Sequence, residues 1–421
     1  MRAAERVEPI DPEELPRLRQ RALWTLFTVS ALGSTGYIAS ITVGTIAAAE
    51  ISGTAAWGGV PITATTIGTA LAASLLGVLM VRIGRRRGVL LGLGIGAVGG
   101  VASVLAILAG SIAVLLFASA LVGVANGTSQ LGRYIAADLF ATDRRASAIS
   151  TVVWGTTIGA VAGPNLIAPA GAWAGAMGLP ELAGAYGMTM LFIGLAAVVA
   201  FVFLRPEPYA IAIPAEPGSV AAVEPRRSNA RVMAGPTVLA AALTLVAAQV
   251  AMVLIMTMTP LHLLDHGHGL ATVGFVLSAH MFGMFALSPI SGRLADRFGS
   301  PRVIAAGLIL LGGAALLAAA APPEGGLWLT VALFLLGYGW NLCFVAGSAL
   351  LTSDLALAER GRIQGLTDGL TWGTAAFASL AAGVIVAGAS FSVLALLAGG
   401  VLVAPIVALL LARRKAVTAT A

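Results

Sequence analysis

Twelve long apolar runs restrict how this chain can fold. Each is close to the roughly 20 residues that a helix needs to cross about 30 Å of hydrocarbon, whereas a barrel strand needs about half that length. With 58% apolar and 10% charged residues, the 421-residue chain also falls outside the composition of soluble globular proteins. We therefore predict an all-α membrane protein with twelve transmembrane helices, near 22–46, 58–80, 89–109, 112–136, 147–169, 184–205, 233–260, 270–291, 303–321, 327–351, 363–388 and 391–412.

The basic residues predict the direction of every span. Lys and Arg are retained on the cytoplasmic side, and here they occupy alternate gaps: the N-terminal tail, 82–87, 144–145, 205–231, 293–302, 360–362 and 413–415. Arg133 lies near the same end of its own run. We expect a multi-pass protein of the plasma or bacterial inner membrane with both termini cytoplasmic. The net charge of +6 then reflects topology and contacts with membrane lipids, not nucleic acid.

A charged stretch with five prolines, 206–225, divides the chain into halves and indicates a cytoplasmic linker. The expected layout is a tail (1–21), a six-helix bundle (22–205), the linker (206–232), a second six-helix bundle (233–412) and a tail (413–421). Features of the first half recur in the second at nearly constant spacing. This duplication predicts two pseudo-symmetric bundles with a substrate path between them. The recurring features are Gly77, Arg82 and Gly84 with Gly292, Arg297 and Gly299; Asp138 and Arg144 with Asp354 and Arg360; and 154–156 with 372–374.

Two loops carry a recognisable pattern. Segment 292–302, GRLADRFGSPR, closely resembles the G-x-L-x-D-R-x-G-x-x-R loop of the major facilitator superfamily, and 77–87, GVLMVRIGRRR, is similar with Val81 in place of the aspartate. The resemblance implies an alternating-access transporter in which Asp296 helps to lock the cytoplasmic gate near the start of the fifth span. The lock of the first half is in doubt because Val81 has no carboxylate.

Glycines Gly155, Gly159 and Gly163 precede Pro164 in the fifth span. This spacing resembles the glycine–proline pattern of exporters in the superfamily, and it equally fits close helix packing alone. Drug–proton antiporters of the family carry an arginine in the outer half of the fourth span. The matching stretch 117–123 has none, which argues against their usual route.

Polar and aromatic side chains within the spans are candidates for contact with substrate, because such groups normally face a cavity or a partner. The resemblance implies that the first, fourth, seventh and tenth spans line the cavity. Interhelical hydrogen bonds are the alternative role for the amides, and helix packing for the aromatic residues. The candidates are Tyr37, Asn126, Gln130, Trp154, Gln249, Trp340, Asn341 and Trp372.

Charged residues supply the candidates for gating and coupling. Arg133 needs a partner within the membrane; we expect a salt bridge to Asp368 that breaks when the cavity opens inward, with a static link or a pair with Asp138 as alternatives. His280 titrates near neutral pH if it faces water, although a bond to a neighbouring carbonyl is the commoner role of such a residue. The full set is Arg82, Arg133, Asp138, Arg144, His280, Asp296, Arg297, Asp354 and Asp368.

Other chemistries find little support. His262, His266, His268 and Asp265 resemble a metal site, but a loop beside a membrane needs polar residues anyway, so we expect no metal. Neither a phosphate-binding loop nor a hydrolytic or redox triad is visible, and we expect neither enzyme activity nor a cofactor.

We expect a monomeric secondary transporter of a small organic molecule, driven by a proton or other ion gradient. Export of amphipathic or aromatic compounds is slightly favoured. The alternatives are uptake of an aromatic nutrient or vitamin similar to riboflavin, or a non-transporting sensor or lipid-moving protein.

Overall fold

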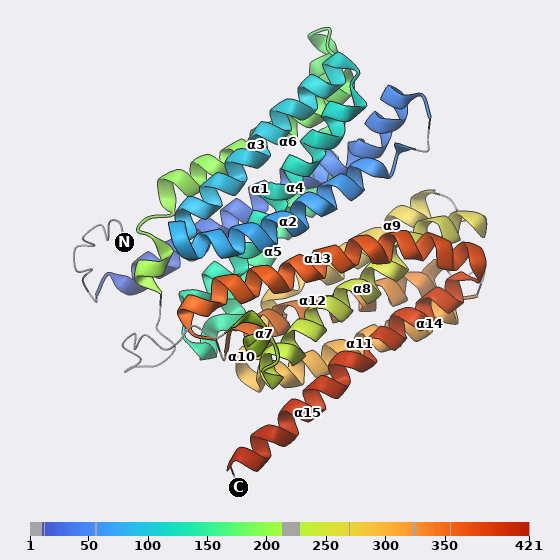
Figure 1. The fold of residues 1–421 in the computed structure, drawn as a ribbon. Helices are drawn as coiled ribbons and strands as arrows, with labels where there is room; N and C mark the ends of the chain where they lie inside the picture. Colours follow the sequence, from blue (N-terminus) through green and yellow to red (C-terminus); the bar gives the residue numbers. More distant parts are fainter. Residues whose placement is uncertain are drawn as a thin grey trace.

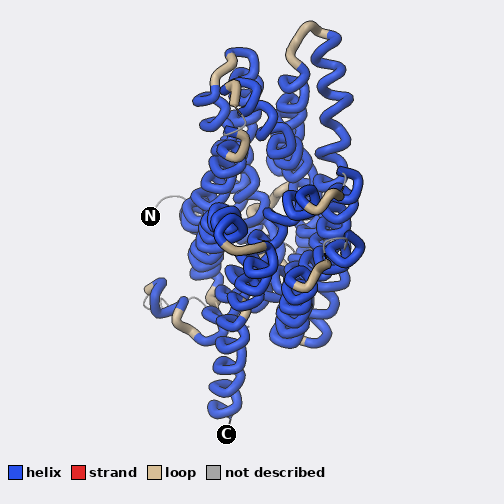
Figure 2. Tube along the Cα trace, turned by 90° about the vertical axis from the view of Figure 1, so that its right-hand side faces the viewer, coloured by secondary structure: helices blue, strands red, loops and turns tan. Residues whose placement is uncertain are grey.

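The computed structural model describes residues 11, 13–54, 57–212, 228–268, 270–322, 326–353 and 355–420, and all of the regular structure in these ranges is helical (Figure 2). The first half is a bundle of six long helices (Figure 1). They are α1 (Leu15–Ser52), α2 (Val60–Ile83), α3 (Arg85–Ala109), α4 (Ile112–Asp138), α5 (Arg145–Ala176) and α6 (Glu181–Phe203).

The described parts of the linker are a short 3-10 turn (Pro208–Ile211) and α7 (Asn229–Met233), and its residues 213–227 lie outside the described ranges. The second half forms a matching bundle beside the first (Figure 1). Its helices are α8 (Pro236–Asp265), α9 (Leu270–Met281), a π-helical turn (Phe282–Ala286), α10 (Ser288–Phe298), α11 (Ser300–Ala319), α12 (Gly326–Ser353), α13 (Leu357–Gly388), α14 (Phe391–Val401) and α15 (Val403–Thr420).

The twelve predicted spans are confirmed. Among the described residues, eleven helices are long and apolar enough to cross a membrane, and α9 with α10 forms the twelfth, bent by 42°. Pro289, in the first turn of α10, accounts for the bend, because it has no N–H to donate to the carbonyl of Phe285. The chain accommodates this missing bond in the π-helical turn.

Several helices extend beyond the apolar runs. Helix α1 begins at Leu15, inside the predicted tail, and the two motif loops are tight turns between helices. Gly84 (φ 93°) and Gly299 (φ 84°) make these turns in a backbone conformation that only glycine adopts without strain. Sequence-based bounds stop short because charged side chains at a helix end lower the hydropathy while the helix continues.

The two halves meet along α2 with α13 and along α5 with α10. A side chain at Gly77 would lie 2.6 Å from the Cα atom of Gly365, and one at Gly292 would overlap Ser150 on α5. These contacts lie toward the end of the bundles that carries Arg85, Asp138 and Arg360, which we call the basic end. Glycines therefore let the halves close against each other at the basic end.

Candidate functional site

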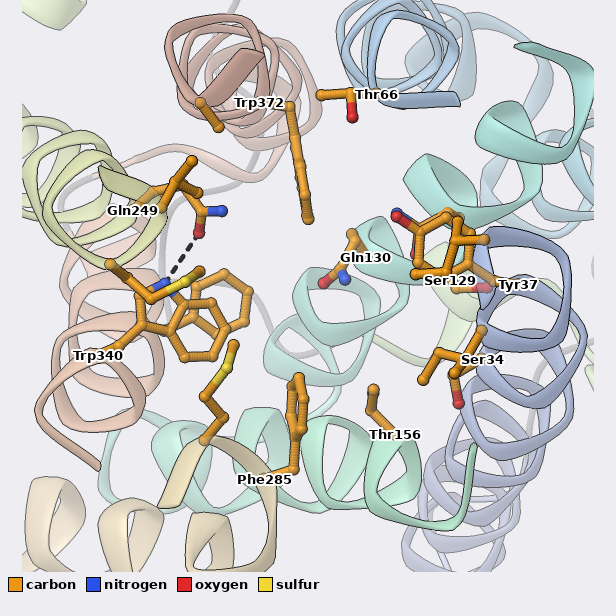
Figure 3. A pocket seen from close by; sticks show the side chains of 18 of the residues that line it. Ser34, Tyr37, Thr66, Ser129, Gln130, Thr156, Gln249, Phe285, Trp340 and Trp372 are labelled. Carbon is orange, nitrogen blue, oxygen red and sulfur yellow. Dashed lines mark hydrogen bonds between the residues drawn. The ribbon is translucent and has the colours of Figure 1, made fainter. Parts of the chain in front are cut away.

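A cavity of about 290 Å³ lies between the two bundles. It extends from Arg133 to the first turn of α2, at the end opposite the basic end, and most of its wall is apolar. Both halves contribute: Figure 3 shows Tyr37, Ser34 and Ser129 facing Trp340, Gln249 and Trp372 across the space. Such a compartment suits an organic molecule better than a bare ion.

Six of the eight predicted contact residues line the cavity: Tyr37, Asn126, Gln130, Gln249, Trp340 and Trp372. The placement of Asn341 was wrong, because it is fully buried between helices. Its Nδ2 atom donates to the carbonyl of Met284 and to Ser288 Oγ, both at 2.6 Å, beside the π-helical turn. Asn341 therefore stabilises the bend of the eighth span, which is the alternative role for such an amide.

The placement of Trp154 was also wrong. Its side chain is 40% exposed on the outside of the bundle and packs against Phe27, with ring centroids 5.5 Å apart. The neighbouring glycines of α5 explain this orientation, because Gly155, Gly159 and Gly163 turn their face toward α1. The glycine pattern is thus used in packing within the first half.

An aromatic cluster with one amide forms the wall of the second half. Trp340 Nε1 donates a 2.8 Å hydrogen bond to Gln249 Oε1 (Figure 3). The Trp340 ring stacks on Phe344 at 4.4 Å and meets Phe285 edge-on at 6.0 Å. Sequence reasoning missed Phe344 and Phe285, although Phe344 is one helical turn from Trp340 and shares its face of α12.

Methionines fill much of the remaining wall. Met252 and Met256 come from α8, Met281 is the last residue of α9, and Met284 lies within the π-helical turn. Their unbranched side chains adapt to ligands of differing shape. The wall can therefore close around a flat ring without a rigid matching pocket.

A buried ion pair forms the floor of the cavity. Arg133 Nη2 lies 2.6 Å from Asp368 Oδ1, and Tyr134 donates to the same oxygen at 3.0 Å. The guanidinium Cζ lies 4.2 Å from the ring centroids of both Tyr134 and Phe344. The predicted Arg133–Asp368 pair is present, and the alternative pair with Asp138 is not. Because the charges offset each other, the floor offers a ligand little net charge.

Asp138 instead links two other arginines at the basic end. Its two oxygens pair with Arg85 Nη2 at 2.8 Å and with Arg360 Nη1 at 3.0 Å, and all three side chains are buried. Arg85 belongs to the first half and Arg360 to the second, so the carboxylate joins the bundles. Sequence reasoning assigned Asp138 to the gate but missed both partners. The signal for Arg85 was its position directly after the glycine turn at Gly84.

Asp296 makes the predicted contact with the fifth span. Its two carboxylate oxygens accept hydrogen bonds from the backbone N–H groups of Ala146 and Ser147, each at 2.9 Å. These amides belong to the first turn of α5, where N–H groups lack partners within the helix. The carboxylate thereby joins the second half to the first and is favoured by the helix dipole.

Three predicted gate arginines, Arg82, Arg144 and Arg297, are exposed at the basic end. Within the described ranges, none of their side chains makes a hydrogen bond or an ion pair. Buried neighbours make the contacts between halves instead: Arg85, as above, and Arg145, whose Nη1 donates to the carbonyl of Thr352 at 3.5 Å. Asp354 lies outside the described residues.

Among the described residues, no carboxylate joins the halves at Val81 itself. The Val81 side chain approaches Gly361 of α13, and the adjoining helices pack closely through glycines. The N-terminus of α3 is capped by Glu207, from the linker segment of the same half, whose Oε1 accepts from the Arg85 N–H at 2.6 Å. The two motif loops therefore make different contacts: Asp296 reaches the N-terminus of α5, whereas beside Val81 the contact of α2 with α13 is made by close glycine packing.

The histidines have structural partners. His280 is fully buried and its Nδ1 lies 2.9 Å from the carbonyl of Leu333, so it does not face the cavity. His262 stacks on Phe391 at 4.2 Å, and His266 Nδ1 lies 2.7 Å from the carbonyl of His262. Among the described residues, no group of three or more His, Cys, Asp or Glu side chains is arranged to hold a metal ion.

Comparisons with known proteins agree with this architecture. The family model of the Major Facilitator Superfamily matches residues 23–367 and 241–420. The chain is 36% identical over 396 residues to the uncharacterized MFS-type transporter YdeG of Bacillus subtilis (strain 168), covering 92% of this chain and 91% of the relative. It is 29% identical over 398 residues to the riboflavin transporter RfnT of Brucella anthropi, covering 93% of this chain and 94% of the relative. The fold is similar to the fucose:proton symporter FucP of E. coli, with a TM-score of 0.72, 14% identity and coverage of 93% and 98%.

Proposed function

Because this chain belongs to the major facilitator superfamily, we propose that it is a secondary transporter that takes up a neutral, flat aromatic molecule of the riboflavin type. The observation that carries the proposal is the cavity between the halves, with Trp340, Trp372 and Phe285 as flat apolar surfaces and amides as polar contacts. The offset charges of Arg133 and Asp368 favour a neutral ligand over an ionic one.

The positions of the interhalf bonds support alternating access. Among the described residues, hydrogen bonds and ion pairs between the halves occur only from the cavity floor to the basic end. We place the basic end in the cytoplasm, since arginines are retained there. The structure then represents the state with its cavity toward the outside. Release into the cell requires the contacts of Asp138, Asp296 and Asp368 to break.

Uptake is proposed over export for two reasons. The glycine face of α5 resembles an exporter pattern, but it packs on α1. Helix packing accounts for these glycines, so they do not favour export. The relative RfnT is a riboflavin transporter, and the similarity to it spans nearly the whole of both chains. Efflux of amphipathic aromatic compounds is the second candidate, favoured by the four methionines of the wall.

We propose a proton as the coupling ion and a monomer as the working unit. Asp368 is a carboxylic acid in the ion pair at the cavity floor. FucP, whose fold is similar, is a fucose:proton symporter. One chain supplies the whole cavity, so a second copy is not needed to complete it.

The test is exchange of labelled riboflavin in proteoliposomes, with protein-free liposomes as the control. Ligand at about a hundred times its dissociation constant also stabilises the protein by about 2.7 kcal/mol, which a thermal melt detects. Growth of a riboflavin-requiring bacterium at low vitamin concentration then reports the direction. Absence of both stabilisation and exchange with riboflavin contradicts the proposal, and exchange of unrelated lipophilic compounds instead supports efflux.

A further inference from the structure

Two glutamine side chains enter the cavity from opposite halves, and the oxygen atom of each already has a partner. Gln130 belongs to α4 and Gln249 to α8, and Figure 3 shows them on different sides of the space beneath Trp372. An amide carries one oxygen acceptor and one nitrogen with two donors. Once a neighbour fixes the oxygen, the nitrogen is the group left for a ligand.

Trp340 fixes the amide of Gln249. The indole N–H is a donor only, so the atom of Gln249 at 2.8 Å from Trp340 Nε1 must be the oxygen. Trp340 cannot easily turn away, because its ring is stacked on Phe344 and is 4% exposed. The Nε2 atom of Gln249 makes no hydrogen bond within the described part of the chain, and it faces the cavity in Figure 3.

Arg133 fixes the amide of Gln130 in the same way. Its Nη1 donates to the Gln130 backbone carbonyl at 2.6 Å and lies 3.5 Å from Gln130 Oε1. A guanidinium has no acceptor, so the oxygen faces it, and the ion pair with Asp368 holds the guanidinium in place. The nitrogen of Gln130 is thereby also presented as a donor.

Asn126 has the opposite polarity. Its Nδ2 donates to Thr69 Oγ1 at 3.3 Å. The Thr69 hydroxyl shares its own proton between the carbonyls of Thr65 and Gly123, at 3.0 and 3.1 Å, so it accepts from Asn126. The Asn126 oxygen is left as an acceptor one helical turn from Gln130, on the same face of α4. This face therefore offers an acceptor beside a donor.

We infer that the substrate is a heteroaromatic ring bearing carbonyl groups, of the lactam or imide class. One carbonyl accepts from Gln249, and an adjacent C=O and N–H pair meets Gln130 and Asn126. The isoalloxazine ring of riboflavin belongs to this class, whereas carbonyl-free lipophilic cations do not. The inference rests on the proposed function and adds that Gln249 selects the ligand, with Trp340 as its positioning residue.

The experiment measures equilibrium binding of riboflavin and of ethidium, a carbonyl-free aromatic cation, to the full-length protein in detergent. The variants are Gln249→Glu, Trp340→Phe and the double variant. Gln249→Glu keeps an acceptor for Trp340 but replaces the donors with a carboxylate, so the Kd for riboflavin should rise about 10- to 100-fold. Asn165→Asp, an amide-to-acid change at an exposed residue of α5 outside the cavity, is the matched control and should leave the Kd unchanged. Thermal melts establish that each variant is folded.

Trp340→Phe keeps an aromatic surface but removes the indole N–H that holds Gln249, so the double variant should bind riboflavin no more weakly than Gln249→Glu alone. Additive losses would instead assign Trp340 a packing role only and overturn its positioning role. Riboflavin binding by Gln249→Glu equal to wild type, or ethidium binding by wild type as tight as riboflavin binding, overturns the inference while leaving the transporter proposal intact. Wild type that neither binds nor exchanges riboflavin overturns both.

Discussion

The carboxylate of Asp296 should hold the basic end closed, and Asp296→Asn tests this. The carboxylate accepts two N–H groups of the first turn of α5. Asparagine keeps one acceptor oxygen, but its NH₂ group faces the second N–H. One charge-assisted bond contributes about 1.5–3 kcal/mol, and the site is half exposed, so we take about 2 kcal/mol for the loss. At 1.4 kcal/mol per factor of ten, the ratio of closed to open molecules should fall about 30-fold.

Distance measurement between spin labels gives a direct readout. Arg87 and Arg302 are exposed on opposite halves at the basic end, and cysteines there accept labels, while the native Cys343 is fully buried. Wild type should give a short distance, and Asp296→Asn should add a longer population. Transport should slow while ligand still binds. Asp143→Asn, which changes an exposed carboxylate in the nearby turn, is the control. A distance distribution identical to wild type would refute the reasoning.

Three further outcomes are expected. Asp368→Asn leaves the Arg133 guanidinium buried without a counter-charge and should lower the free energy of unfolding by about 3 kcal/mol, seen as a lower melting temperature; an unchanged melt would contradict the role of the pair. Gly365→Val places side-chain atoms against α2 and should shift the spin-label distance to the open population, whereas Gly373→Val, on the same helix with open space around it, should not. Val81→Asp adds a carboxylate near the unpartnered Arg85 Nη1 and should partly restore closure in the Asp296→Asn background; no recovery would count against it.

The span count could be predicted from the sequence because it depends on length and hydropathy, which act over whole segments. The contact of Asp296 with α5 was also predictable, because a helix N-terminus needs acceptors for its N–H groups. The Arg133–Asp368 pair followed from the cost of an unpaired charge in the membrane. In the last two cases a group needs a partner, an acceptor or a counter-charge, and few residues of the sequence could supply it.

The orientation of side chains within the core helices was not predictable. Helix α12 is buried on nearly every side, so hydropathy does not indicate which face meets the cavity. Trp340 faces it and the next residue, Asn341, does not, a difference of about 100° around the helix. Pro289 is a partial sequence signal for the π-helical turn. That Asn341 donates hydrogen bonds beside this turn depends on how α12 packs against it, which the sequence does not indicate. The same limit applies to Arg82 and Arg85, which are three residues apart across the Gly84 turn.

The bent eighth span connects the cavity wall to the contact with α5. Phe285, in the cavity wall, and Asp296, bound to α5, are eleven residues apart, about 16 Å along the course of this span. The bend between α9 and α10 lies just after Phe285, so the point about which α10 could tilt is next to the cavity. We expect that a ligand pressing on the Phe285 ring would tilt α10 about this bend and draw the Asp296 carboxylate away from α5. Ligand binding and opening of the basic end would then be coupled within a single span.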